Sequence, residues 1–161
     1  MKTKIEYQLI GVIHTPFKKR EGMPIQPAGA DGVQGTVEVF QEFTEGLQDL
    51  EGFSHIILLY HFHQSTDAAL RVTPFMDSQP RGVFSTRAPK RPNPIGISVV
   101  KLIKIEGSTL HIENVDIIDE TPLLDIKPYV PEFDHYPADR IGWLEKARNG
   151  VRKKRSDNRF K

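Results

Sequence analysis

The 161-residue chain contains no cysteine, so disulfide bonds, thiolate catalysis and zinc sites with cysteine ligands are excluded. No apolar run approaches the roughly eighteen residues of a membrane-spanning helix, so none is predicted. The first residues, MKTKIEY, lack the apolar segment of a secretory signal. We therefore expect a cytoplasmic protein that makes no membrane contact.

The sequence motifs of several common enzyme classes are also missing. There is no GxGxxG after a strand and no GxxxxGK[ST], so the usual dinucleotide and phosphate cradles are absent. There is no GxSxG motif, which removes the common serine nucleophile of acyl transfer.

Strand signals dominate what is present. Short apolar or alternating segments are separated by glycine and proline, and no long helical pattern lies between them. The clearest pair is a hairpin of residues 95–105 and 109–118. We also expect strands at residues 7–14, 35–43, 53–62 and 82–86, of which 53–62 is apolar on both faces and is predicted to be fully buried. The pattern predicts a mainly β fold, a small antiparallel β-barrel with short helices.

The charge is unevenly divided along the chain. Residues 138–161 carry nine Lys/Arg and three Asp/Glu, a net +6, whereas residues 1–137 carry −5. We predict a barrel domain over 7–137 and a basic C-terminal helix or tail over 138–161, because apolar residues recur at helical spacing after Asp139. Such a tail either contacts nucleic acid or is a solvated chain end.

Three loops carry unusual chemistry. Residues 85–98, STRAPKRPNPIGIS, hold three prolines and three cations, which favours a rigid site for an anionic partner. Residues 23–27, MPIQP, place an amide between two prolines, and residues 116–130 place several carboxylates beside two prolines. Each of the last two could also be an ordinary connection or turn.

Together these segments resemble one family. The strings FSHIILLYHFHQ, STRAPKRPNPIG and DETPLLDIKPYVP follow one another as in the TsaA-like, or TrmO, family, and the resemblance covers residues 7 to about 137. Its members are S-adenosylmethionine-dependent tRNA methyltransferases with a small β-barrel, which N-methylate threonylcarbamoyladenosine next to the anticodon. The resemblance implies S-adenosylmethionine as cofactor, a tRNA anticodon stem-loop as partner, and a homodimer.

The resemblance also implies where the cofactor binds. The positions that match the family strings are Pro24, Ile25, Gln26, His63, Gln64, Arg91, Leu102, Asp119, Thr121, Pro122, Leu123, Leu124 and Asp125. The accepting nitrogen is a poor nucleophile, because its lone pair is delocalised, so a group that takes its proton would help. His63, Asp119 and Asp125 are the candidate catalytic residues, and the sequence does not rank them.

Two other functions stay open. Glu120 stands where the family commonly has glycine, so a damaged loop could leave a non-catalytic module that binds S-adenosylmethionine or RNA. A metal-dependent barrel enzyme could use His61 and His63, although no acidic residue lies within their strand and hydrogen-bonded imidazoles are the commoner interpretation.

Overall fold

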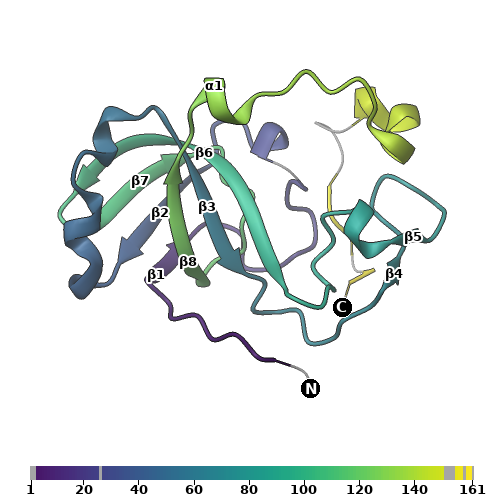
Figure 1. Ribbon diagram of the computed structural model, residues 1–161, viewed down its shortest axis with the longest axis horizontal. Helices are drawn as coiled ribbons and strands as arrows, with labels where there is room; N and C mark the ends of the chain where they lie inside the picture. Colours follow the sequence, from purple (N-terminus) through teal and green to yellow (C-terminus); the bar gives the residue numbers. More distant parts are fainter. Residues whose placement is uncertain (1–2, 26, 151–154, 158, 161) are drawn as a thin grey trace.

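The computed structural model describes residues 3–25, 27–150, 155–157, 159 and 160. The chain forms a closed six-stranded antiparallel barrel, with most loops and short helices gathered on one side of it (Figure 1). The strands follow the order β1–β2–β7–β6–β3–β8, and β8 pairs with β1 to close the barrel. They are β1 (Gly11–His14), β2 (Gln34–Val39), β3 (His55–His61), β6 (Ile95–Glu106), β7 (Thr109–Glu113) and β8 (Thr121–Pro128). The predicted mainly β barrel is confirmed.

The remaining elements are short. A two-stranded ribbon pairs β4 (Arg71–Val72) with β5 (Arg81–Gly82), and one turn of α-helix, α1 (Pro131–Asp134), follows β8. The 3-10 helices are η1 (Pro27–Gly29), η2 (Gln41–Leu47), η3 (Leu50–Gly52), η4 (Val83–Ser85) and η5 (Gly142–Gly150). Among the helices that the structure describes, none is long and apolar enough to cross a bilayer.

The barrel interior is filled by alternate residues of each strand. On β3, Ile56, Leu58 and Tyr60 face inward and are at most 5% exposed, whereas the residues between them are only partly buried. The prediction that residues 53–62 are buried on both faces is therefore wrong for the single chain, because their second face forms the outside of the barrel.

Strand ends differ from the sequence prediction for local reasons. The β6–β7 hairpin is present, but β7 stops at Glu113 instead of continuing to residue 118. The reason is Asn114, whose φ of 66° leaves the strand conformation and whose side-chain oxygen accepts a hydrogen bond from the Gly32 N–H at 2.9 Å. The predicted strand over 82–86 is reduced to β5 and then turns into η4.

The C-terminal part of the chain returns to the body of the protein. The expected helix is the 3-10 helix η5, which begins at Gly142 rather than near Asp139, since Gly142 has a φ of 57°. Phe160, only 4% exposed, packs with Val72, Val83 and Ala88 in a second apolar cluster. The domain boundary at residue 137 stays a prediction.

Candidate active site

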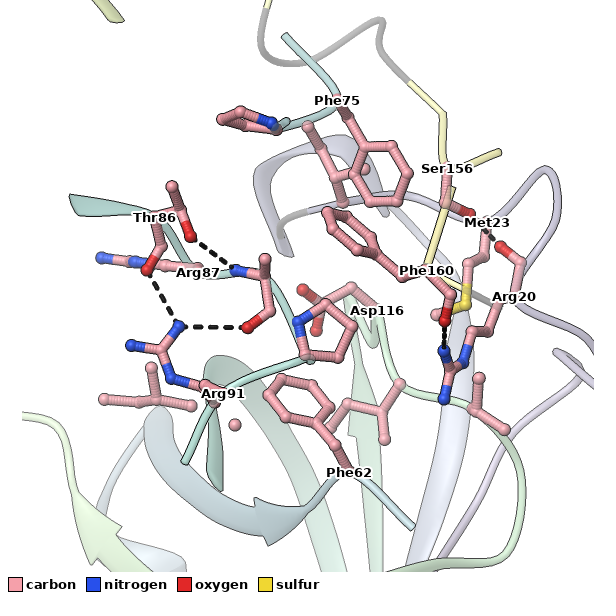
Figure 2. A pocket seen from close by; sticks show the side chains of 18 of the residues that line it. Arg20, Met23, Phe62, Phe75, Thr86, Arg87, Arg91, Asp116, Ser156 and Phe160 are labelled. Carbon is pink, nitrogen blue, oxygen red and sulfur yellow. Dashed lines mark hydrogen bonds between the residues drawn. The ribbon is translucent and has the colours of Figure 1, made fainter. Parts of the chain in front are cut away.

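A cavity of about 580 Å³ lies where β3 ends and β6 begins. Its walls come from residues 20–25, the end of β3, residues 74–76, the 84–91 loop, the start of β6, residues 116–121 and the C-terminal residues. The cavity has the size of sites that enclose drug-sized ligands. Figure 2 shows the adjacent rings of Phe75 and Phe160 above the ring of Phe62, with Arg87 and Arg91 together on one side and Arg20 on the other.

The proline-rich loop forms one wall and is held by its own hydrogen bonds. Arg91 Nη1 donates to the carbonyl oxygens of Thr86 and Ala88, both at 3.0 Å. Thr86 Oγ1 donates to Val83 O at 2.8 Å. The same oxygen accepts from the Ala88 N–H at 3.2 Å (Figure 2). Arg91 therefore shapes the wall in addition to lining it, and this is the rigidity that the three prolines predicted.

His63 and Thr121 meet at another part of the cavity. His63 follows the end of β3, and its Nδ1 lies 3.5 Å from Thr121 Oγ1. Partial burial lowers the pKa of His63, and electrostatic interactions with His61 and Arg20 lower it further. These surroundings favour the neutral imidazole, and only the charge of Glu120 and a backbone hydrogen bond act in the opposite direction.

The tail end, defined here as residues 155–157, 159 and 160, joins two walls of the cavity. The Gly22 N–H donates to Ser156 O and the Ser156 N–H donates to Met23 O, both at 3.0 Å, and the Arg20 guanidinium donates to Phe160 O. On the other side, the Phe160 ring lies edge-on to Phe75, with 5.1 Å between the ring centres. Instead of being a solvated end, the described tail closes part of the cavity.

Three polar residues at the cavity form a chain of hydrogen bonds that the sequence analysis missed. The Tyr60 hydroxyl lies 2.9 Å from Ser98 Oγ, and Ser98 Oγ donates to Asp116 Oδ1 at 2.5 Å. Burial raises the pKa of Asp116 to about 6, against the opposing effects of Ser98 and Arg87. One signal was available: Ser98 shares the inward face of β6 with Val100 and Leu102, where a hydroxyl needs a polar partner.

The structure brings only part of the predicted site together. Of the predicted positions, six line the cavity: Pro24, Ile25, His63, Gln64, Arg91 and Thr121. Gln26 lies outside the described residues. Leu102 and Leu123 lie in the barrel core instead, since both point inward from their strands.

Asp119, a candidate base, is already engaged in the single chain. It accepts hydrogen bonds from the Thr15 N–H at 2.9 Å and from the Lys18 ammonium, and His14 Nδ1 lies 3.7 Å away. Burial alone would raise the pKa of Asp119, but Lys18 and the Thr15 N–H together hold it below its usual value. Asp119 thus ties the end of β1 to the start of β8 and does not line the cavity.

Pro122, Leu124 and Asp125 do not line the cavity of the single chain either. Asp125 pairs with Lys127 at 2.8 Å, and its cross-strand partner is the outward-facing Leu59. Leu124 is the extra residue of a β-bulge, because Leu123 pairs with Tyr60 and Asp125 pairs with Leu59. The cofactor contacts of these residues stay predictions.

The described part of the chain contains no cluster of side chains that supports the hypothesis of a metal site. No group of three or more His, Asp or Glu side chains there is placed to hold a metal ion. His61 is the last residue of β3, and the Phe62 N–H after it donates to Pro94 O at 2.8 Å.

Glu120 gives the first testable prediction. Its φ of 60° is a left-handed conformation that costs a residue with a Cβ about 1 kcal/mol, so the turn keeps the shape that glycine favours despite the substitution. We expect Glu120→Gly to raise the free energy of unfolding by about 0.5 kcal/mol, because relief of this strain outweighs the extra freedom of glycine in the unfolded chain. Urea denaturation measures the change. Glu120→Ala keeps the Cβ and is the control; equal stabilisation by alanine would assign the effect to charge.

Comparisons with known proteins agree with the geometry. Residues 12–135 match the family model described as the tRNA-methyltransferase O N-terminal domain. A probable S-adenosyl-L-methionine-binding protein from Pyrococcus abyssi is 58% identical over 96% of this chain and 84% of its own length. The tRNA (adenine(37)-N6)-methyltransferase of Escherichia coli is 32% identical over 90% of this chain and 66% of its own length.

Solved structures give the same result. The crystal structure of TrmO from Pseudomonas aeruginosa superposes with a TM-score of 0.74 at 38% identity, over 88% of this chain. The chain spans 63% of that protein, so it corresponds to part of the longer bacterial relative. The barrel, the loops around its cavity and the family match lead to one conclusion: this chain belongs to the tRNA-methyltransferase O family, through its N-terminal domain.

Proposed function

We propose that the protein is a methyltransferase that uses S-adenosylmethionine to methylate N6 of adenosine 37 in tRNA, and that its substrate is the threonylcarbamoylated form. The observation that carries the proposal is the match of residues 12–135 to the family together with a cavity walled by the proline loop that bears the family strings. The names of the relatives support both the cofactor and the tRNA.

The residues of the cavity suit this cofactor. S-adenosylmethionine carries an adenine, a carboxylate and a sulfonium whose methyl group is transferred. The rings of Phe62 and Phe75 offer apolar faces for a purine, and Arg20 and Arg87 bring cationic groups for a carboxylate. An enzyme that holds the methyl donor and the acceptor nitrogen in line lowers the activation barrier mainly by orienting them. The rigid proline loop favours such orientation.

We also propose that the active unit is a homodimer. On the outer face of the barrel, Ile57 of β3 pairs with Val99 of β6, and Leu59 pairs with Ile97, which is 46% exposed. This stripe is the second apolar face of residues 53–62, and a second copy seated on it would bury it. Ile97 also lines the cavity. A partner at this face would therefore bring residues such as Leu124 and Asp125 toward a neighbouring cavity.

The proposed RNA contacts are electrostatic. Lys18, Lys19 and Arg20 precede the Pro24 wall, and Lys18 and Lys19 are exposed. Cations beside a cavity attract the phosphates of an anticodon stem-loop, with an affinity that falls as salt rises. The basic run Arg152–Arg155 of the sequence lies largely outside the described residues. A tRNA substrate favours a cytoplasmic location.

Methyl transfer from labelled S-adenosylmethionine to threonylcarbamoylated tRNA tests the proposal. We expect transfer at adenosine 37, located by nuclease digestion and mass spectrometry, and none to the same tRNA without the threonylcarbamoyl group. We expect Arg91→Ala to weaken cofactor binding in calorimetry by about tenfold or more, because two bonds that shape the wall are lost. Arg71→Ala, which removes an exposed arginine outside the cavity lining, is the control.

The outcomes separate the proposed enzyme from a binding module. Cofactor binding without transfer to any tRNA would favour a non-catalytic S-adenosylmethionine-binding protein, a possibility that the names of the archaeal relatives support. Absence of cofactor binding in the wild type would contradict both functions.

A further inference from the structure

The hydrogen-bond chain Tyr60–Ser98–Asp116 gathers residues from three separate parts of the fold at one side of the cavity. Tyr60 comes from β3, Ser98 from β6 and Asp116 from the segment between β7 and β8. Tyr60 is 5% exposed and Ser98 is 2% exposed, so both hydroxyl-bearing side chains are buried. Tyr60 and Asp116 line the cavity. Figure 2 shows the Asp116 carboxylate between Phe62 and Phe160, directed toward the cavity.

The backbone of β6 is shaped to admit this arrangement. A Cβ placed on Gly96 would lie 2.3 Å from the Tyr60 ring and 2.9 Å from the Phe62 ring. Tyr60 pairs directly with Gly96 across the two strands, so its ring lies against bare backbone and its hydroxyl reaches the hydroxyl of Ser98. The position of the tyrosine hydroxyl is therefore set by the sheet.

Both hydrogen bonds of this chain are donated in the same direction, from Tyr60 toward Asp116. Ser98 has a single hydroxyl hydrogen, which it donates to Asp116, so the Tyr60 hydroxyl must be the donor to Ser98. Burial raises the pKa of Tyr60, and the nearby charge of Asp116 raises it further, so Tyr60 keeps its proton. Asp116 is thus the acceptor at the end of the chain.

The surroundings of the Asp116 carboxylate allow it to bind a proton. The groups that face it are the hydroxyls of Tyr60 and Ser98 and the Arg87 guanidinium, which is exposed. Burial raises the pKa of its carboxyl to about 6, so it is ionised at pH 7 yet binds a proton readily. A proton acceptor works best with a pKa near the working pH. By contrast, the Asp119 carboxylate is paired with the Lys18 ammonium and does not line the cavity.

We propose that Asp116 is the catalytic proton acceptor of the cavity, and that Ser98 and Tyr60 are its positioning residues. This role rests on the proposed methyltransferase function. As the bond from sulfur to the methyl carbon breaks, its electron pair stays on sulfur, and the nitrogen lone pair forms the new bond to that carbon. The N–H proton passes to Asp116, which becomes a neutral carboxylic acid and loses the proton to water once the product has left.

Single-turnover methyl transfer as a function of pH, with calorimetric binding of S-adenosylmethionine, tests this role. Asp116→Asn keeps the shape and is expected to bind the cofactor within about threefold of the wild type. We expect its transfer rate to fall about 10²- to 10⁴-fold, the usual contribution of a general base. The acidic limb of the wild-type profile, with a midpoint near pH 6, should vanish. Asp31→Asn, which removes one exposed carboxylate outside the cavity lining, should change neither quantity.

Ser98→Ala supplies a measurement that a purely structural role would not move. The Ser98 hydrogen bond lowers the pKa of Asp116, so its loss should shift the acidic midpoint upward. A transfer rate of Asp116→Asn within threefold of the wild type, or an unmoved midpoint in Ser98→Ala, would overturn the role. Loss of cofactor binding in Asp116→Asn would overturn it too, by making Asp116 a binding group. A wild type that binds the cofactor but transfers no methyl group to any tRNA would contradict the proposed function itself, before any variant is compared.

Discussion

Replacement of Phe160 by alanine is expected to weaken S-adenosylmethionine binding about thirtyfold while leaving the barrel folded. Phe160 is 4% exposed, and truncation of a buried phenylalanine removes several kcal/mol of packing. Its contacts lie in the small cluster with Val72, Val83 and Ala88, so the loss falls on the tail end and not on the barrel core. We expect about 2 kcal/mol of this loss to oppose binding, because the tail end must be ordered again when the cofactor binds. A cost of about 2 kcal/mol lowers the affinity about thirtyfold.

Isothermal calorimetry measures this change, and urea unfolding followed by circular dichroism checks the barrel. Phe133→Ala is a matched control, because the same ring is removed from a side chain that is 71% exposed. Unchanged affinity in Phe160→Ala would show that the tail end is not part of the binding wall. Tighter binding would show that the tail occupies space that the cofactor needs.

The second large effect is expected from Ile97→Asp. If a second copy covers the outer stripe, this change buries a carboxylate without a partner, at a cost of several kcal/mol. We expect the dimer dissociation constant to rise more than a hundredfold, and cofactor binding to weaken with it because Ile97 also lines the cavity. Analytical ultracentrifugation over a range of concentrations measures the first effect.

Ile103→Asp is the control for this experiment. Ile103 lies on the same strand and is 47% exposed, almost the same as Ile97, but it falls beyond the apolar pairs with β3. A wild-type protein that stays monomeric at all concentrations would contradict the proposed dimer. Dissociation by both variants would instead place the interface along the whole length of β6.

The barrel was predictable because its signals are local. Alternation of apolar residues marks a strand wherever one face is buried, and the Glu106-Gly107-Ser108 turn marks the hairpin. The ends of strands were less predictable, since Asn114 leaves the strand through a contact with Gly32, which is remote in sequence. The second apolar face of β3 was correctly seen as apolar, but burial within the single chain does not follow from that pattern.

The lining of the candidate site was predictable only where its residues lie within one distinctive segment. Pro24, His63 and Arg91 lie in segments with distinctive strings, and all three line the cavity. The register of the sheet and the turn after β7 bring Asp116, Ser98 and Tyr60 together. Their contact cannot be predicted from a short sequence motif, because they come from three distant segments. The return of Phe160 depends on an apolar cluster assembled from distant segments.

Closure of the barrel limits how this protein can meet another molecule. Each of the six described barrel strands has a hydrogen-bonded neighbour on both sides, so none presents an open edge to an added strand. Partners must therefore dock through side chains on the curved outer surface, or at the loops around the cavity. Single substitutions on these surfaces can then alter association while the hydrogen-bonded ladder stays intact, and recognition can diverge among relatives without loss of the fold.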